Sequence, residues 1–173
     1  MAIQYSVALK NALLASNSLK EALESANAAP VGMYLFLFAG PVPATPDAAL
    51  NMAADHTQVV KVAADATAIA NGIVPLQLAA TATAGYITKA TAQTWKGLID
   101  FDGVSSAAPS LAPTFFRLCA GGDNGRGAGG ASSFRVQGTC GVVGADLLLP
   151  NATLEDNGTN EFGLGAAQFG FPA

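Results

Sequence analysis

The first part of the chain carries apolar residues at the spacing of an α-helix. Residues mostly four positions apart form one stripe, which consists of Tyr5, Leu9, Leu13, Leu19 and Leu23. Such a stripe is typical of a helix that lays one face on another surface. Ser6 is a suitable N-cap, and Pro30 ends the segment. The pattern predicts a helical segment over residues 1–29, which could divide into two short helices at residues 16–18.

The pattern changes after this segment. Residues 33–38 form a short apolar run rich in aromatic side chains, which favours a buried strand. The next residues contain Pro41, Pro43 and Pro46, which rule out regular structure there because proline lacks a backbone donor. Residues 47–50 are expected to form one helical turn. We expect this proline-rich stretch and the helical segment to be the main docking elements.

The remainder of the chain reads as short strands separated by glycine-rich turns. The predicted strands cover residues 57–62, 73–78, 85–89, 95–101, 114–119, 133–138, 145–149 and 168–171. Strands at this spacing, without a repeated strand-helix-strand unit, indicate an antiparallel sheet. The predicted fold is therefore mainly β, with a β-sandwich or jelly-roll-like body over residues 30–173 and an N-terminal α-helix.

Residues 121–130 form a long glycine-rich loop between two of the predicted strands. A phosphate-binding loop would need a Gly-Lys pair followed by Ser or Thr at the start of a helix, and this loop leads into a strand. A mobile hairpin tip is the simpler interpretation. The alternative is a loop that becomes ordered against a neighbouring subunit, with Arg126 as its charged anchor.

Composition and charge narrow the classes of function. Hydrophobic residues make up 51% of the chain and charged residues 12%, about half the usual charged fraction. The net charge is -4 and the Lys and Arg residues are scattered, which argues against direct binding to nucleic acid. The longest strongly apolar run, residues 31–39, is too short to cross a bilayer. We expect a protein made in a reducing cytoplasm, without membrane contact.

Candidate chemistry is sparse. His56 is the single histidine, and no pattern of metal ligands surrounds it, so no metal and no cofactor are expected. The acidic pairs, which could serve glycoside hydrolysis, are Asp100 with Asp102 and Glu155 with Asp156. Both lie in turn-like sequence, where acidic residues favour solubility and turns. The sequence therefore predicts a protein that is not an enzyme.

Two cysteines, Cys119 and Cys140, lie at or just after predicted strands. If those strands pair, the two thiols could face one another and form a bond after host lysis. The simpler interpretation is that both are small buried residues. Two Cα atoms further apart than about 7 Å would exclude the bond.

Several segments occur in an order that resembles a family of small proteins encoded by tailed phages. These segments are residues 5–12, 35–40, 43–50, 95–97, 114–118, 136–138 and 144–147. The resemblance touches the whole length of the chain. It implies a β-sandwich component of the virion, such as a capsid decoration protein or a tail-associated subunit, and it supplies no catalytic residues. The chain departs from the family pattern in a longer Ala- and Thr-rich middle and a longer glycine-rich loop.

The resulting expectation is a structural subunit of a tailed-phage virion, synthesised in the cytoplasm of the bacterial host. Its partners would be other virion proteins, either the major capsid protein or tail and baseplate subunits, and further copies in a homo-oligomer such as a trimer. The residues expected to make these contacts are Tyr5, Leu9, Leu13, Leu19, Leu23, Pro41, Pro43, Pro46 and Arg126. The alternative is a receptor- or glycan-binding module of the tail or baseplate, with Tyr86, Trp95 and the glycine-rich loop as its surface.

Overall fold

A computed structural model describes most of the chain. The described residues are 3–15, 18–25, 33–63, 86–88, 95–102, 110–120, 122–149, 154–155, 161–164 and 168–170. The helices are α1 (Val7–Leu14) and α2 (Leu19–Ser25). The strands are β1 (Gln4–Tyr5), β2 (Tyr34–Ala39), β3 (Thr57–Ala63), β4 (Tyr86–Thr88), β5 (Trp95–Asp102), β6 (Ser110–Leu111), β7 (Phe115–Cys119), β8 (Arg135–Gly141), β9 (Leu147–Leu148), β10 (Leu154–Glu155), β11 (Glu161–Leu164) and β12 (Gln168–Gly170).

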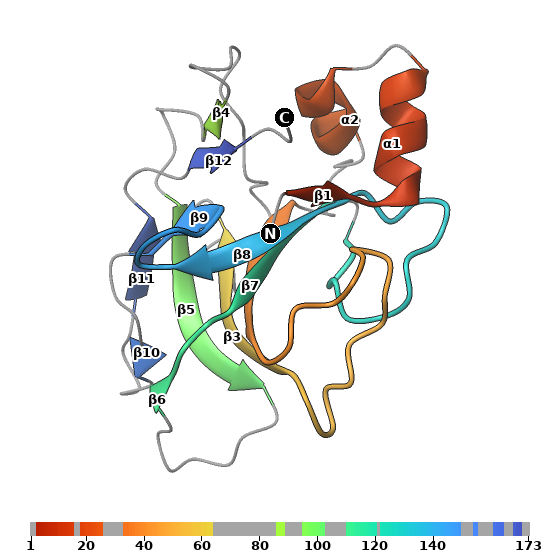
Figure 1. The fold of residues 1–173 in the computed structure, drawn as a ribbon. Helices are drawn as coiled ribbons and strands as arrows, with labels where there is room; N and C mark the ends of the chain where they lie inside the picture. Colours follow the sequence, from red (N-terminus) through yellow and green to blue (C-terminus); the bar gives the residue numbers. More distant parts are fainter. Residues whose placement is uncertain are drawn as a thin grey trace.

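Eight of these strands form one main sheet (Figure 1). Its order is β1-β8-β7-β2-β3-β5-β11, and β9 lies beside β8. Every pairing along that order is antiparallel, whereas β9 runs parallel to β8. Two smaller sheets pair β10 with β6 and β12 with β4. The prediction of a mainly β, antiparallel protein is therefore confirmed.

Most of the strands expected from the sequence are present. The segments predicted to be strands coincide with β2, β3, β4, β5, β7, β8, β9 and β12. The strand predicted over residues 73–78 lies outside the described residues. Residues 47–50 do not form the expected helical turn. Ala48 N instead donates to Thr45 O in a tight turn at 3.2 Å, and Leu50 N donates across to Arg126 O at 2.7 Å.

The N-terminal segment contains two helices. Ser6 caps α1 as predicted, because its hydroxyl accepts a hydrogen bond from Leu9 N at 3.2 Å. Before α2, the Ser18 hydroxyl accepts from Glu21 N at 3.2 Å, and Ser18 N donates to the Glu21 carboxylate at 2.9 Å. This reciprocal pair is a capping box, which explains why a new helix begins at this point.

The prediction that Tyr5 belongs to the helical stripe is wrong. Gln4 and Tyr5 form β1, and Tyr5 lies opposite Val136 of β8. Ser6 N extends the pairing by donating to Arg135 O at 2.9 Å. Backbone hydrogen bonds to an existing sheet edge therefore outweigh the helical spacing that Tyr5 shares with Leu9.

The larger hydrophobic cluster lies on one face of the main sheet. Leu35 and Leu37 of β2 are fully buried there, with Phe116 of β7 beside them. Leu9 of α1 and Leu23 of α2 are also fully buried in this cluster. The N-terminal segment thus contributes a strand to the sheet and apolar side chains to its core.

The opposite face of the sheet is also buried. A second cluster there contains Phe36, Phe38 and Phe115, with the stacked rings of Phe38 and Phe115 5.1 Å apart. Leu50 packs against this cluster from the β2–β3 connection. We call residues 40–50 the strap, because this stretch crosses the aromatic face. It contains no helix or strand, as the prolines predicted.

Candidate functional site

A row of buried polar side chains lies between the sheet and the strap. Arg117 of β7 is directly opposite Gln137 of β8, and Arg135 lies two residues before Gln137 on the same face. All three side chains are almost completely enclosed. Buried charges require several hydrogen bonds to offset the loss of water. The hydrogen-bond partners of these three side chains therefore show the structural role of the row.

Arg117 is satisfied by neutral oxygen atoms. Its Nε donates to Gln137 Oε1 at 2.9 Å. Its Nη2 donates to the strap carbonyls of Thr45 at 3.3 Å and Ala48 at 2.9 Å, and its Nη1 donates to Gly125 O. Burial and the nearby positive charge of Arg135 lower the pKa of Arg117 to about 10, so it remains charged at neutral pH.

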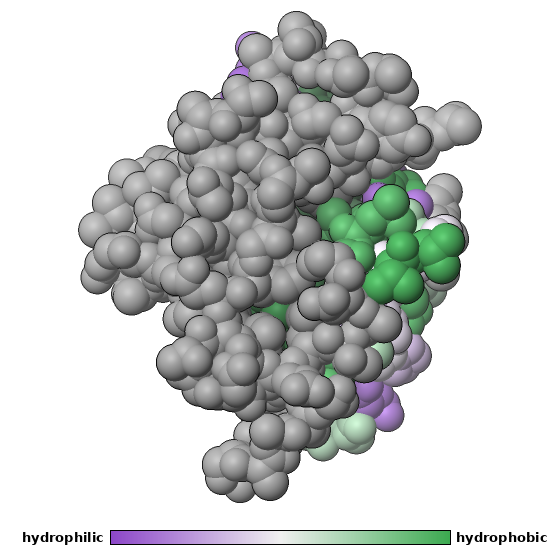
Figure 2. Space-filling view, turned by 90° about the vertical axis from the view of Figure 1, so that its left-hand side faces the viewer, coloured by the Kyte–Doolittle hydropathy of each residue, from purple (hydrophilic) through white to green (hydrophobic). Residues whose placement is uncertain are grey.

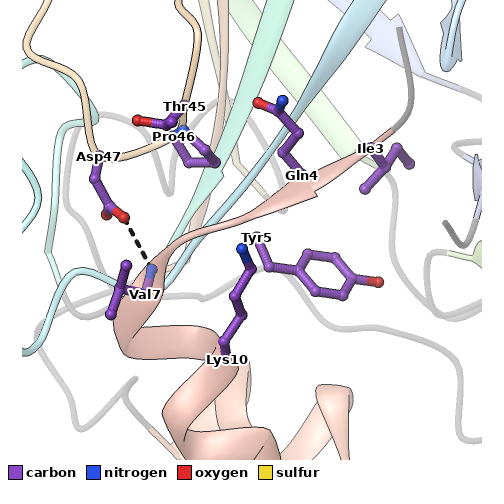
Figure 3. A pocket seen from close by; sticks show the side chains of 8 residues that line it. All are labelled: Ile3, Gln4, Tyr5, Val7, Lys10, Thr45, Pro46 and Asp47. Atoms are coloured by element: carbon purple, nitrogen blue, oxygen red, sulfur yellow. Dashed lines mark hydrogen bonds between the residues drawn. The ribbon is translucent and has the colours of Figure 1, made fainter.

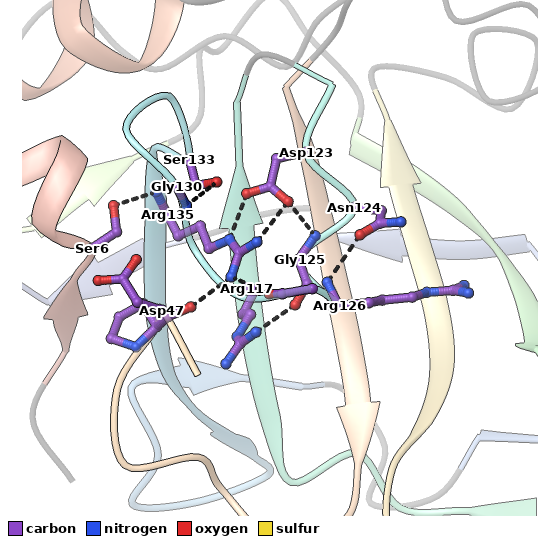
Figure 4. A network of polar contacts seen from close by, with 12 residues as sticks. Ser6, Asp47, Arg117, Asp123, Asn124, Gly125, Arg126, Gly130, Ser133 and Arg135 are labelled. Atoms are coloured by element: carbon purple, nitrogen blue, oxygen red, sulfur yellow. Dashed lines mark hydrogen bonds and ion pairs between the residues drawn. The ribbon is translucent and has the colours of Figure 1, made fainter. Parts of the chain in front are cut away.

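Arg135 has a carboxylate partner. Its Nη2 donates to Asp123 Oδ1 at 2.9 Å and its Nε to Asp123 Oδ2, a two-pronged ion pair (Figure 4). Burial alone would raise the pKa of Asp123, but hydrogen bonds from Arg135 and Gly125 N hold it below its usual value. Arg135 Nη1 also donates to Pro46 O and Gly127 O, both at 2.9 Å.

The two arginines tie the strap and the glycine-rich loop to the sheet. The loop and the strap are also bonded directly to each other, because Gly129 N donates to Asp47 O at 2.8 Å. The Arg126 guanidinium points back into the chain and donates from Nη2 to Gln58 Oε1 at 2.9 Å. These hydrogen bonds hold the loop that the sequence predicted to be a mobile hairpin tip. The contact that Arg126 makes is with Gln58 of the same chain.

His56 has a structural position. Its Nδ1 accepts from Asn51 N at 3.2 Å, and its Nε2 lies 2.9 Å from Pro41 O. A neutral ring with the proton on Nε2 satisfies both contacts. The ring also meets Phe115 edge-on at 5.9 Å. His56 therefore fixes the two ends of the β2–β3 connection to each other.

The two cysteines are free and buried, and they lie on opposite faces of the sheet. Cys119 belongs to the aromatic cluster, whereas Cys140 belongs to the larger core. The alternation of side chains along β7 and β8 places them apart, so the possibility that the thiols face one another is wrong. Burial raises the pKa of both thiols, that of Cys140 to about 12.

A groove of about 520 Å3 runs beside β1. Its lining combines residues of β1, the start of α1 and the strap, namely Ile3, Gln4, Tyr5, Val7, Lys10, Thr45, Pro46 and Asp47. Figure 3 shows Thr45 and Pro46 on one side of the strand and Tyr5 and Lys10 on the other. Asp47 Oδ2 closes one end by accepting from Val7 N at 2.9 Å.

Exposed apolar side chains gather in two places. Beside the groove, Val7 and Leu14 of α1 are 61% and 85% exposed. They are seven residues apart and so lie on one side of the helix, with the exposed Lys10 and Asn11 between them. On the other side of the molecule, the β8–β9 turn exposes Val142, Val143 and Leu148, with Val143 82% exposed. Figure 2 shows a continuous hydrophobic patch on the side where this turn lies.

The turn that carries the second patch is firmly held. Asp146 Oδ2 accepts from both the backbone N and the hydroxyl of Thr139, each at 2.8 Å. Leu149 N donates to Gly141 O at 2.9 Å, beyond the parallel pairing of β8 with β9. The two valines are therefore presented in a defined position, and a preformed surface of this kind loses little entropy in a contact.

The structure separates the contact residues predicted from the sequence. Leu9 and Leu23 are fully buried in the core and cannot meet a partner in the folded chain. Leu13 and Leu19 are partly buried against the same core. The remaining predicted residues lie along the groove, the strap and the loop; they are Tyr5, Pro41, Pro43, Pro46 and Arg126. Val7 and Leu14, which are exposed on α1, were not among the residues predicted from the sequence.

For the other candidate residues that it describes, the structure gives the backbone alone. Asp100 and Asp102 lie in β5 and Glu155 in β10, but their side chains are outside the described part of the structure, as are those of Tyr86 and Trp95. Within the described ranges, His, Cys, Asp and Glu side chains form no group that could hold a metal ion. In the same ranges, the helices are too short to span a bilayer.

Comparison with known proteins gave no match to a family model, a curated protein or a solved structure.

Proposed function

We propose that this protein is a structural subunit that acts through protein–protein contacts. The observation that carries the proposal is that two parts of the chain expose apolar side chains, Val7 and Leu14 on α1 and Val142 and Val143 on the β8–β9 turn. Figure 1 shows α1 and the β8–β9 turn on opposite sides of the molecule. Apolar residues gathered on an exposed surface commonly mark interaction sites. Two different surfaces on one chain permit head-to-tail contacts, which build rings or extended arrays.

The assembly that we propose is the virion of a tailed phage, with this chain as a capsid decoration or tail-associated subunit. The support is the ordered set of segments that resembles the phage family, together with the low charge of the chain. We also propose that the small β4–β12 and β6–β10 sheets belong to a second layer of a β-sandwich. The contact between β12 and β9 of the main sheet supports this arrangement.

Quantitative mass spectrometry of purified particles tests the proposed function. Particles are purified from a culture that carries the genome encoding the chain. The copies of the chain are then counted relative to the major capsid protein. We expect a fixed copy number in wild-type particles. Leu14→Asp and Val143→Asp should each reduce it, because burial of a charge at a contact is unfavourable.

Matched controls are Ala53→Asp in the β2–β3 connection and Ala131→Asp directly after the glycine-rich loop, both exposed positions away from the two apolar surfaces. Thermal unfolding should show that all four variants are folded. A wild-type chain that is missing from purified particles would overturn the virion proposal. Normal incorporation of both apolar-surface variants would overturn the assignment of the contact surfaces.

A further inference from the structure

Among the described residues, no strand pairs with the outer edge of β1 where it meets the groove. Ser6 N donates to Arg135 O at 2.9 Å, so these residues form a hydrogen-bonded pair of the antiparallel ladder. Bonded and non-bonded pairs alternate along such a ladder, so the N–H and C=O of Tyr5 point away from β8. Neither group has a partner among the described residues.

The Tyr5 side chain adds another unpaired polar group. Its hydroxyl is buried and has no hydrogen-bond partner within the described part of the chain. Buried polar groups in folded proteins are nearly always bonded. An unpaired strand edge is also a ready template for another extended chain. The unpaired backbone groups of Tyr5 are therefore typical of an edge that an additional strand would complete, whereas its enclosed hydroxyl lies beyond the reach of such a strand.

The groove has two walls that match the geometry of a strand. Gln4 and Pro46 lie on the strap side, and Lys10 lies on the helix side (Figure 3). Successive side chains of an added strand point to opposite faces. Alternate residues would therefore contact the Pro46 wall and the Lys10 wall, while the backbone bonds to Tyr5.

The charged residues that line the groove favour an added strand with an acidic side chain. The Asp47 carboxylate already accepts from Val7 N, and it lies near the buried Arg117 and Arg135. The Lys10 side chain is exposed and makes no hydrogen bond or ion pair with other described residues. Among the described residues, the Lys10 ammonium is therefore the cation of the groove that still lacks a counter-charge, because Asp47 is bonded to Val7 N. A carboxylate on the helix side of an added strand would supply it.

We propose that the groove binds an extended segment of a neighbouring subunit by strand addition at Tyr5, with an acidic side chain of that segment opposite Lys10. This inference rests on the proposed assembly function. Because Asp47 occupies Val7 N, the open edge is short and each single contact is weak. Repetition around a multi-copy assembly raises the overall strength without new contacts.

The test is a nuclear magnetic resonance titration of the 15N-labelled full chain with two short probe peptides. Both are acetylated, amidated heptapeptides of alternating Thr and Val, one with a central Glu and one with a central Lys. Because a short strand contact binds weakly, the titration extends to about 5 mM. We expect the Glu peptide to shift the Tyr5 amide and to bind about five-fold more tightly than the Lys peptide, as for an exposed ion pair.

The Lys10→Glu variant should reverse this preference, whereas Asn11→Glu, which adds charge to the same helix outside the groove lining, should retain it. No shift of the Tyr5 amide with either peptide would overturn strand addition. Equal affinities, or a preference that Lys10→Glu leaves unchanged, would overturn the acidic partner. Incorporation of the wild-type chain into particles is measured separately, so either failure leaves the proposed function standing.

Discussion

Asp123 and Arg135 face each other as a two-pronged ion pair at the base of the glycine-rich loop, with 2.9 Å between Asp123 Oδ1 and Arg135 Nη2. The pair is largely buried, with 2% of the Arg135 side chain and 13% of the Asp123 side chain exposed. Asp123 also accepts from Gly125 N, so the same carboxylate shapes the loop. The pair therefore joins the conformation of the loop to the sheet.

Replacement of Asp123 by Asn should be strongly destabilising. It leaves the buried Arg135 charge without its counter-charge, which typically costs about 3–5 kcal/mol. Urea unfolding followed by tryptophan fluorescence measures this loss. Asp55→Asn, at an exposed position, is the control and should change the free energy of unfolding by less than about 1 kcal/mol. Equal effects of the two substitutions would show that the pair does not hold the loop.

The same pair predicts a loss of stability in acid. The pKa of Asp123 is lowered in the folded state, so its ionised form stabilises the protein fully above the unfolded pKa of about 3.9. That contribution is lost as the pH falls through the lowered folded pKa. Urea midpoints measured from pH 6 down to pH 3 should therefore fall less steeply in Asp123→Asn than in the wild-type protein. Parallel slopes would contradict the assignment.

Two glycines of one loop should respond differently to alanine. Gly125 has φ +70°, and an added Cβ would lie 2.9 Å from Cys119 Sγ. Gly127 has open space around the same position. We expect Gly125→Ala to lower the free energy of unfolding by more than about 1 kcal/mol, and Gly127→Ala to have little effect. A loop that is loose in solution would tolerate both changes equally.

Two leucines of α1 provide a matched test of the N-terminal segment. Leu9 is fully buried, whereas Leu14 is 85% exposed. Leu9→Ala should cost about 2–5 kcal/mol through the cavity that it leaves. Leu14→Ala should stay within about 0.5 kcal/mol, measured by the same chemical denaturation. If Leu9→Ala were neutral, the helix would not be part of the core.

The thiols should be unreactive in the folded protein. Both cysteines are free and buried, and burial raises the pKa of each, so little thiolate is present at neutral pH. A thiol-specific reagent should label neither cysteine in buffer and both in denaturant. The intact mass after mild oxidation should show no intramolecular bond. Rapid labelling of the native chain would contradict the burial of both groups.

The apolar strands could be predicted from the sequence because their pattern is local. Residues 34–39 and 115–119 are rich in aromatic residues and bounded by Pro or Gly, and both are strands. β1 could not be recognised, because it has two residues and Tyr5 continues the helical spacing of Leu9. What makes it a strand is its pairing with β8, more than a hundred residues later.

The burial of the two arginines could not be predicted from the sequence either, because it also depends on segments that are distant along the chain. Arg135 alternates with apolar neighbours, and such alternation normally indicates a face in contact with solvent, whereas Arg117 is a single charge within an apolar run. Here the strap and the glycine-rich loop cover that face, and both are irregular segments without a recognisable period. The apolar spacing predicted a helix in this region, but only the packing shows that Leu9 faces the core and Leu14 faces outward.

An assembly subunit that makes contact through α1 and the groove should be visible in an image reconstruction of the purified particle. We expect density that fits the main sheet in many symmetric copies, with Val7, Leu14 and the outer edge of β1 against a neighbouring subunit. A particle that lacks such density, or one in which this surface faces solvent, would contradict the account.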